Sequence, residues 1–147
     1  MKKIGIIFQA LIFFLPIVSL CGCSGESNEE TWDEMPEKIS SFLIQYFPGE
    51  CQSFDKLSNG EYVAKMKNSV TVIFNSECQW ISVDGNGGTI SSYFLYDCLN
   101  EKLYNYIDGL GMLDNVYKVF IDKGIYYVEL LDTDIEYDSM TGTITET

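Results

Sequence analysis

The sequence contains no histidine and no arginine, and its nine basic residues are all lysines. Without histidine, a serine or cysteine nucleophile would need a lysine or a carboxylate as its base, so nucleophilic catalysis has little support. The 22 acidic residues outnumber the basic ones and give a formal net charge of −13. Because such a charge repels nucleic acid and anionic lipid headgroups, we expect neither as a partner.

Cysteine is sparse beyond the N-terminal segment, where only Cys51, Cys78 and Cys98 occur. An odd number leaves at least one thiol without a disulfide partner. No Cys-x-x-Cys pair and no histidine accompany them, so a structural zinc site is not indicated. We expect small, half-buried residues with structural roles.

The first 22 residues have the features of a signal peptide. A short basic start is followed by residues 4–20, which are apolar apart from Gln9 and Ser19. A transmembrane anchor is the competing interpretation, but the run is short for a span of about 20 residues, contains Pro16 and lacks a positively charged stop. The segment therefore predicts export and removal of residues 1–22.

The predicted cleavage site, Leu20-Cys21-Gly22-Cys23, resembles the bacterial lipoprotein motif. In that motif the cysteine after a small residue is lipidated, which makes Cys23 the predicted anchor. Several acyl chains together hold a protein on a membrane surface, and we expect membrane contact only through them. An ordinary cleaved signal peptide is the alternative. Both interpretations place the protein in the cell envelope, and both leave open whether it is periplasmic or surface-exposed.

Residues 23–32 form a predicted acidic tether that lacks enough apolar surface to fold by itself. Its Glu26, Glu29 and Glu30 resemble the acidic signals that follow the lipidated cysteine in surface-exposed lipoproteins of the Bacteroidetes. Removal of the signal peptide leaves 125 residues with seven lysines against 22 acids, a side-chain charge of −15. That length suffices for one compact domain or two small, closely packed ones.

Most of the stretch from Tyr62 to Trp80 occurs twice, as does the helix-like segment before it. The matched segments are Glu37-Lys38-Ile39 with Glu101-Lys102-Leu103, Tyr62-Val63 with Tyr126-Tyr127, and Phe74-Asn75 with Tyr137-Asp138. A duplicated pattern of this kind predicts tandem repeats. We place them at residues 33–84 and 99–147 with a joint at 85–98, and we expect the stretch 84–88 to be flexible.

Each repeat is predicted to contain one amphipathic helix and a four-stranded antiparallel meander. This is an α+β fold with the helices packed on one face of the sheet or sheets. The first helix follows Pro36, and its apolar stripe is Ile39, Phe42, Leu43, Tyr46 and Phe47. The second helix is predicted at 99–108, and residues 89–98 have no assignment beyond an extension of it. The predicted strands are 51–57, 61–67, 70–75 and 79–84, then 115–122, 125–131, 133–138 and 143–146.

Alternation along these strands predicts which side chains face the helices and which face away. The helix-facing set is Tyr62, Ala64, Met66, Val70, Val72 and Phe74 in the first repeat and Tyr126, Val128, Leu130, Ile135 and Tyr137 in the second. The open face of the second repeat carries the candidate binding residues Tyr127, Glu129, Leu131, Asp134, Glu136 and Asp138. Aromatic and apolar groups ringed by charge are typical of a recognition surface.

The same strand order separates Cys51 from Cys78. The two lie at opposite ends of a strand, roughly 20 Å apart at a rise of about 3.3 Å per residue. A disulfide requires Cα atoms within about 7 Å, so no Cys51–Cys78 bridge is expected.

The succession of motifs along the chain resembles that of a known family. The motifs are Pro36, Tyr46-Phe47-Pro48-Gly49, Tyr62-Val63, Phe74-Asn75 and Trp80, with a second copy that retains Tyr126, Tyr137-Asp138 and Gly142. Together they resemble the PepSY-like, β-lactamase-inhibitor-like (BLIP-like) exported lipoproteins of the Bacteroidetes, over residues 33–146. The resemblance implies two helix-plus-sheet repeats and, by fold-level analogy alone, an inhibitor function. Cys78 and Asn75 replace the glycine and aspartate that the family has in one turn.

We therefore predict a membrane-tethered binding module, not an enzyme, that recognises or inhibits a protein or peptide. The negative charge of the chain favours a basic partner. Calcium binding is the first alternative, since Asp134, Glu136 and Asp138, or the loop at residues 84–88, offer oxygen ligands without EF-hand spacing. No other cofactor is indicated. A carboxylate-based glycoside hydrolase is the second alternative, disfavoured because alternate acids on a strand are normally solvated.

Overall fold

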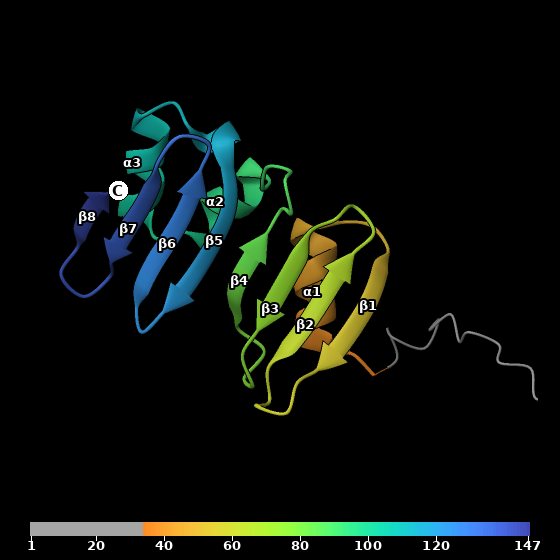
Figure 1. Ribbon diagram of the computed structural model, residues 1–147. Helices are drawn as coiled ribbons and strands as arrows, with labels where there is room; N and C mark the ends of the chain where they lie inside the picture. The colour runs from red at the N-terminus through yellow and green to blue at the C-terminus, as the bar shows by residue number, and fades with distance from the viewer. Residues whose placement is uncertain (1–33) are drawn as a thin grey trace, which may run out of the picture.

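The computed structural model describes residues 34–147 (Figure 1). The first half comprises α1 (Glu37–Tyr46), β1 (Cys51–Lys56), β2 (Tyr62–Met66), β3 (Thr71–Phe74) and β4 (Trp80–Asp84). The second comprises α2 (Ser92–Cys98), α3 (Glu101–Gly109), the short 3-10 helix η2 (Leu113–Asn115), β5 (Val116–Asp122), β6 (Ile125–Leu130), β7 (Asp134–Asp138) and β8 (Thr143–Glu146). Every predicted strand is present. The predicted signal peptide, Cys23 and the tether lie outside the described residues.

All eight strands form one antiparallel sheet in chain order, which confirms the α+β class. The two halves meet where β4 pairs with β5, with Ser82 opposite Phe120, Val83 opposite Val119 and Asp84 opposite Lys118. Short turns join the strands within each half, whereas the connection from β4 to β5 contains α2 and α3. One sheet face therefore runs without interruption through both halves.

The helices lie against one face of this sheet, behind the strands in Figure 1. Strand alternation directs apolar side chains towards them. Of the predicted helix-facing residues, the buried ones are Ala64, Met66, Val72 and Phe74 in the first half and Val128, Leu130, Ile135 and Tyr137 in the second. Tyr62, Val70 and Tyr126 pack half-buried against the same core. The predicted facing of both halves is thus confirmed.

Helix α1 buries the predicted stripe. Ile39 and Leu43 are completely buried and Phe47 nearly so, while Phe42 and Tyr46 pack at the edge of the core. The helix begins after Pro36, where a missing N–H costs nothing because the first N–H groups of a helix have no intrahelical acceptor.

Helix α2 occupies the segment that the sequence left unassigned. Its Phe94 is fully buried, with ring centroids 5.1 Å from Trp80, 5.4 Å from Phe47, 5.8 Å from Tyr46 and 6.1 Å from Phe42. This aromatic cluster packs α2 against α1 and β4. A helix of the second half therefore completes the core of the first.

Helix α2 is a separate helix and does not extend α3. Leu99, between them, has extended backbone with ψ of 155°, and the side chain of Asn100 accepts a 3.0 Å hydrogen bond from the N–H of Lys102. That bond caps the first turn of α3, as asparagine commonly does.

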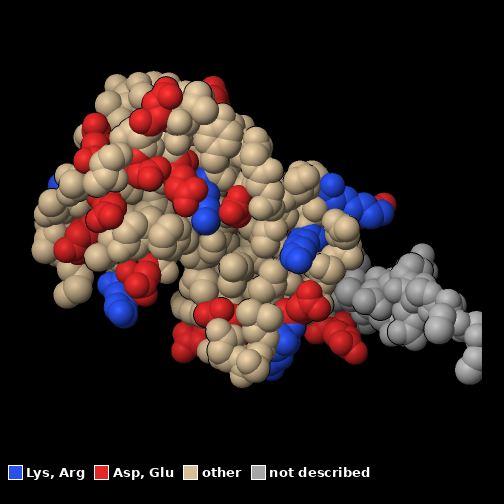
Figure 2. All heavy atoms as spheres, viewed as in Figure 1, with Lys and Arg blue, Asp and Glu red and all other residues tan. Residues whose placement is uncertain are grey.

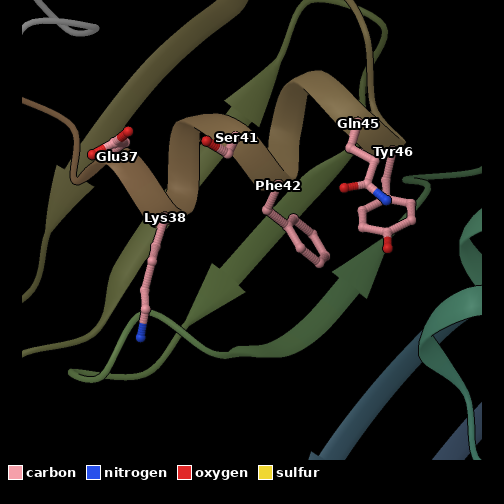
Figure 3. Close-up of a pocket in the computed structure, with 6 residues that line it drawn as sticks. All are labelled: Glu37, Lys38, Ser41, Phe42, Gln45 and Tyr46. Carbon is pink, nitrogen blue, oxygen red and sulfur yellow. The ribbon is translucent and has the colours of Figure 1, made fainter.

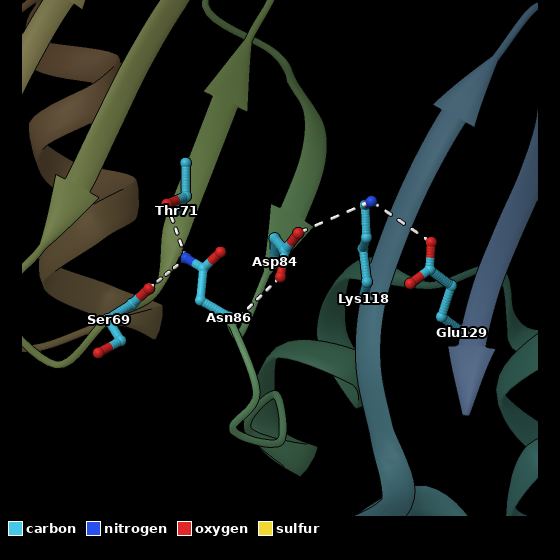
Figure 4. A network of polar contacts seen from close by, with 6 residues as sticks. All are labelled: Ser69, Thr71, Asp84, Asn86, Lys118 and Glu129. Atoms are coloured by element: carbon cyan, nitrogen blue, oxygen red, sulfur yellow. Dashed lines mark hydrogen bonds and ion pairs between the residues drawn. The ribbon is translucent and has the colours of Figure 1, made fainter. Parts of the chain in front are cut away.

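The segment expected to be a flexible joint is hydrogen-bonded to its surroundings. The N–H of Gly85 donates to the carbonyl of Tyr117 over 2.9 Å, and that of Ile90 donates to the carbonyl of Val116 over 2.8 Å. The side chain of Asn86 donates to Thr71 Oγ1 over 2.9 Å (Figure 4). The backbone of this connection thus continues the pairing of β4 with β5.

We expect Gly85→Ala to destabilise the protein by about 1–3 kcal/mol, the usual cost of overpacking. A Cβ at this position would lie 2.0 Å from the Gly88 carbonyl oxygen and 3.2 Å from that of Tyr117, and backbone atoms cannot rotate away. Urea denaturation measures the effect. Gly109→Ala is the matched control, since nothing lies within 4 Å of its added Cβ. Equal stability of the two variants would contradict the tight connection.

The cysteines lie where the predicted strand order puts them. Cys51 is opposite Met66, and Cys78 follows Phe74, which is opposite Tyr62, so the two thiols are at opposite ends of β2. Cys78 adopts a φ of +62°, a conformation that glycine takes without strain, at the position where the family resemblance expects glycine. Burial raises the pKa of the Cys98 thiol to about 11, so it is protonated at neutral pH.

Candidate functional site

The sheet face turned away from the helices, the open face, carries a row of neighbouring side chains that crosses the strands. From β2 to β8 its members are Val63, Ile73, Ser82, Phe120, Tyr127, Glu136 and Thr145. Each is directly opposite the next, and directly opposite side chains interact across strands. The row is apolar or small from β2 to β6 and becomes polar on β7 and β8.

Phe120 and Tyr127 form the aromatic centre of this row. Their rings are stacked, with centroids 4.5 Å apart and an interplanar angle of 10°. The ammonium of Lys118 lies 5.7 Å from the Phe120 centroid, on the adjacent row of the same face. Both aromatic side chains are half-buried, so they are held in place by their neighbours while part of each remains accessible.

A hollow of about 200 Å³ lies beside the aromatic pair, and we call it the β6–β7 hollow. It is lined by Phe120, Tyr127, Val128, Glu129, Asp134, Ile135, Glu136 and Thr147. The predicted residues Tyr127, Glu129, Asp134 and Glu136 therefore come together. The register explains this, because Tyr127 is opposite Glu136 and Glu129 is opposite Asp134.

The acids around the hollow differ in their partners. Glu129 Oε1 lies 3.3 Å from Lys118 Nζ, which is also 3.7 Å from Asp84 Oδ2 (Figure 4). Among residues 34–147, no lysine forms an ion pair with Asp134 or Glu136. Figure 2 shows acidic side chains spread over the half that contains β5–β8. An incoming cation would thus meet two acids that no ion pair already occupies.

Two predicted site residues lie outside the hollow. Leu131 follows β6 in the turn to β7 and is 65% exposed. The carboxylate of Asp138 accepts hydrogen bonds from the backbone N–H groups of Met140, at 2.8 Å, and Thr141, at 3.2 Å. These bonds hold the pKa of Asp138 below its ordinary value. Asp138 therefore stabilises the β7–β8 turn, and its place on the binding face stays a prediction.

The candidate calcium ligands do not converge. In the part of the chain described, no three Asp, Glu, Cys or His side chains lie close enough together to hold a metal ion. Asp138 is used by its turn, and alternate residues on a strand are separated by about 6–7 Å. In the other candidate loop, Asp84 accepts the Asn86 N–H over 2.7 Å and faces Lys118. Calcium binding by Asp134, Glu136 and Asp138 as one site is not supported.

Two further hollows lie on the helical side. One, of about 480 Å³, follows α1 and is lined by Glu37, Lys38, Ser41, Phe42, Gln45 and Tyr46 (Figure 3). The other, of about 570 Å³, lies at the junction of the halves and is lined by Phe42, Asn75, Cys78, Gln79, Trp80, Ile81, Cys98, Ile121 and Tyr126. Phe42, common to both, packs against Phe74 and Phe94 as part of the core. We therefore regard the open face as the better candidate.

Sequence reasoning missed Phe120, the partner of Tyr127. The signal was present, because Phe120 alternates with the buried Val119 on a predicted strand. What was lacking was the pairing of β5 with β6 in a known register, which places the two rings side by side.

No protein-family model matches the sequence, and the curated proteins gave no match. Solved structures do match. One is described as a "putative periplasmic protein" of the DUF2874 family from Bacteroides vulgatus, with a TM-score of 0.63, 17% identity, and coverage of 77% of this chain and 89% of that one. A "putative periplasmic protein of unknown function" from the same species has a TM-score of 0.64 and 14% identity, with coverage of 80% of this chain and 95% of that one.

A third structure is described as a "putative calcium-regulated periplasmic protein" from Bacteroides thetaiotaomicron. Its TM-score is 0.63 at 19% identity, with coverage of 77% of this chain and 89% of that one. At these identities the likeness shows a shared fold. Within residues 34–147, no helix has the length and apolar character needed to cross a membrane.

Proposed function

We propose that this chain is an exported, membrane-tethered binding module that recognises a protein or peptide through the open face of β5–β7. The observation that carries the proposal is the stacked Phe120–Tyr127 pair beside the β6–β7 hollow. Aromatic side chains that are already ordered lose little conformational entropy on binding and are frequent hot spots of interfaces.

The charge around the hollow favours a basic ligand. Asp134 and Glu136 are exposed, and the chain carries 22 acidic residues against nine lysines. Exposed charges chiefly speed the association of an oppositely charged partner and select against wrong ones. Recognition or inhibition of a basic protein or peptide is therefore the function we favour over catalysis.

The proposal is tested by affinity capture. The chain without its signal peptide, and with Cys23→Ser, is immobilised and exposed to envelope extract of the source cells, with and without a calcium chelator. We expect the bait to capture specific proteins that are eluted by salt. The same experiment with Tyr127→Ala should recover less of these proteins. Recovery that is equal for both baits would count against the open face.

An envelope location is supported by the signal-peptide pattern and by the neighbours, all three of which are described as periplasmic. We propose lipidation of Cys23 as the means of attachment. Cys23→Ser is expected to move the protein from the membrane fraction to the soluble fraction, because several buried acyl chains hold a protein almost irreversibly. Immunoblots of the two fractions measure this. Unchanged membrane partitioning would refute lipidation at this residue.

Calcium binding is a second candidate because one neighbour is described as calcium-regulated. The acidic side chains of residues 34–147 do not form a set of calcium ligands in this conformation. Titration calorimetry with calcium chloride, followed by the capture experiment with chelator, distinguishes a calcium-dependent module from the one proposed first.

We also propose that the two halves are duplicated units. Each first strand pairs with its neighbour through a register shift near its start, between Cys51 and Ser53 in β1 and between Val116 and Lys118 in β5. An irregularity at matching positions supports descent from one helix-plus-sheet unit, since β-bulges are retained within families.

A further inference from the structure

We propose that the outer edge of β8 accepts an extended basic peptide as a ninth strand, antiparallel to β8. This inference rests on the proposed function and specifies how its ligand is held. Addition of a strand to a sheet edge is a recurring mode of peptide recognition, in which backbone hydrogen bonds give affinity and alternate side chains give specificity.

The register shows which backbone groups point outward from β8. Asp134 and Thr147 exchange both of their backbone hydrogen bonds, at 3.0 and 2.9 Å. In an antiparallel pair such residues alternate with residues whose N–H and C=O groups point away from the partner strand. Ile144 and Glu146 occupy those alternate positions in β8. Within residues 34–147 no strand pairs with this edge.

The two edges of the sheet differ in how they are protected. Strand β1, at the other edge, carries the register shift between Cys51 and Ser53 and ends in Lys56. Bulges and lysines are common means of preventing edge-to-edge pairing. Strand β8 has the sequence TITE, pairs regularly with β7 and contains neither lysine nor proline. Of the two edges, β8 is therefore the one without a bulge, a lysine or a proline.

Charge selects the occupant. On the open face, Thr143 and Thr145 lie beside Asp138 and Glu136 of β7. Neighbouring strands are about 4.8 Å apart, so a ninth strand would lie about 10 Å from β7. A lysine or arginine side chain can extend over a small threonine towards Glu136. A second copy of this chain would instead bring together two strongly acidic surfaces.

The other face of β8 defines the alternate positions of the peptide. Ile144 packs against the core, and the Glu146 carboxylate accepts a hydrogen bond from the Tyr106 hydroxyl. Peptide residues opposite these two would face the helices, where an apolar side chain suits Ile144. The expected ligand therefore alternates basic and apolar residues.

The probe is a fluorescent peptide of alternating lysine and valine, titrated into the chain without its signal peptide. In the proposed pairing the valine N–H groups point at β8 and the lysine N–H groups point away. N-methylation of two valines, which removes two hydrogen bonds to β8, should weaken binding by about fivefold or more. N-methylation of two lysines, the matched control, should change the dissociation constant by less than about threefold.

A pair of protein variants tests the same edge. Glu146→Pro and Glu146→Ala both remove the carboxylate, but only proline removes the outward N–H. Proline is tolerated on an edge strand when its nitrogen faces solvent. Glu146→Pro should bind the peptide about twofold to tenfold more weakly than Glu146→Ala, with similar circular dichroism. The modified peptides test the proposal even if that variant unfolds.

Several results would overturn this inference. Equal weakening by both sets of N-methyl groups would show that the peptide does not pair with the edge of β8 and would leave the proposed function intact. Absence of peptide binding would reject a basic extended ligand. A dimer that sedimentation detects and Glu146→Pro abolishes would show that the edge pairs with a second copy. Loss of captured partners in Tyr127→Ala, by contrast, reports on the proposed function alone.

Discussion

Phe94→Ala is expected to destabilise the protein by about 3–5 kcal/mol, the usual cost of truncating a buried phenylalanine. The ring is fully buried and lies within 6.1 Å of four other aromatic rings. Its removal would leave a cavity where α1, α2 and β4 meet, and the favourable edge-to-face contact with Trp80 would be lost. Chemical denaturation monitored by circular dichroism measures the change.

The matched control is Ile44→Ala on α1, which should stay within about 0.5 kcal/mol of the parent because surface substitutions usually do. Ile44 is 66% exposed. If Phe94→Ala were as mild as Ile44→Ala, α2 would not be part of the common core, and the two halves would be held together by the pairing of β4 with β5 alone.

Tyr127→Ala is expected to weaken partner binding by about 2 kcal/mol or more, roughly thirtyfold, the loss typical of an interface hot spot. The residue stacks on Phe120, lines the β6–β7 hollow and lies opposite Glu136. Titration calorimetry with a partner recovered by capture measures the loss. Tyr96→Ala is the control, since Tyr96 is 67% exposed and belongs to α2 on the helical side.

The acids should contribute less to affinity than the aromatic pair does. Asp134→Asn combined with Glu136→Gln should cost about 1 kcal/mol or less and should reduce the salt dependence of association, because exposed charges act mainly on the association rate. A double variant that loses more affinity than Tyr127→Ala would mean that charge, and not the aromatic pair, dominates recognition.

Much of the fold could be predicted from the sequence because its signals are local. Alternation along residues 62–66 and 71–74, and again along 125–130 and 134–138, determines which side chains face the helices, and short turns determine which strands are neighbours. Helix α2 was not predicted as a separate helix because it is only seven residues long. Its exposed Tyr93 and Tyr96 stand beside buried Phe94 and Leu95, which gives no clear helical period.

The site was only partly predictable for a different reason. Tyr127, Glu129, Asp134 and Glu136 share a face by alternation, so their grouping follows from the sequence. The stacking of Phe120 on Tyr127 depends on the register between two strands, and the role of Asp138 depends on turn hydrogen bonds to Met140 and Thr141. Neither the register nor the turn geometry can be predicted from residue type alone.

Amide NMR spectra of the isotope-labelled chain, recorded as a captured partner is added, identify the residues that the partner contacts. We expect the largest shifts and line broadening at Phe120, Tyr127 and Glu136, with α1 and α3 nearly unchanged. Shifts concentrated on α1, or on the open face of β2 and β3, would contradict the assignment of the β5–β7 face as the binding surface.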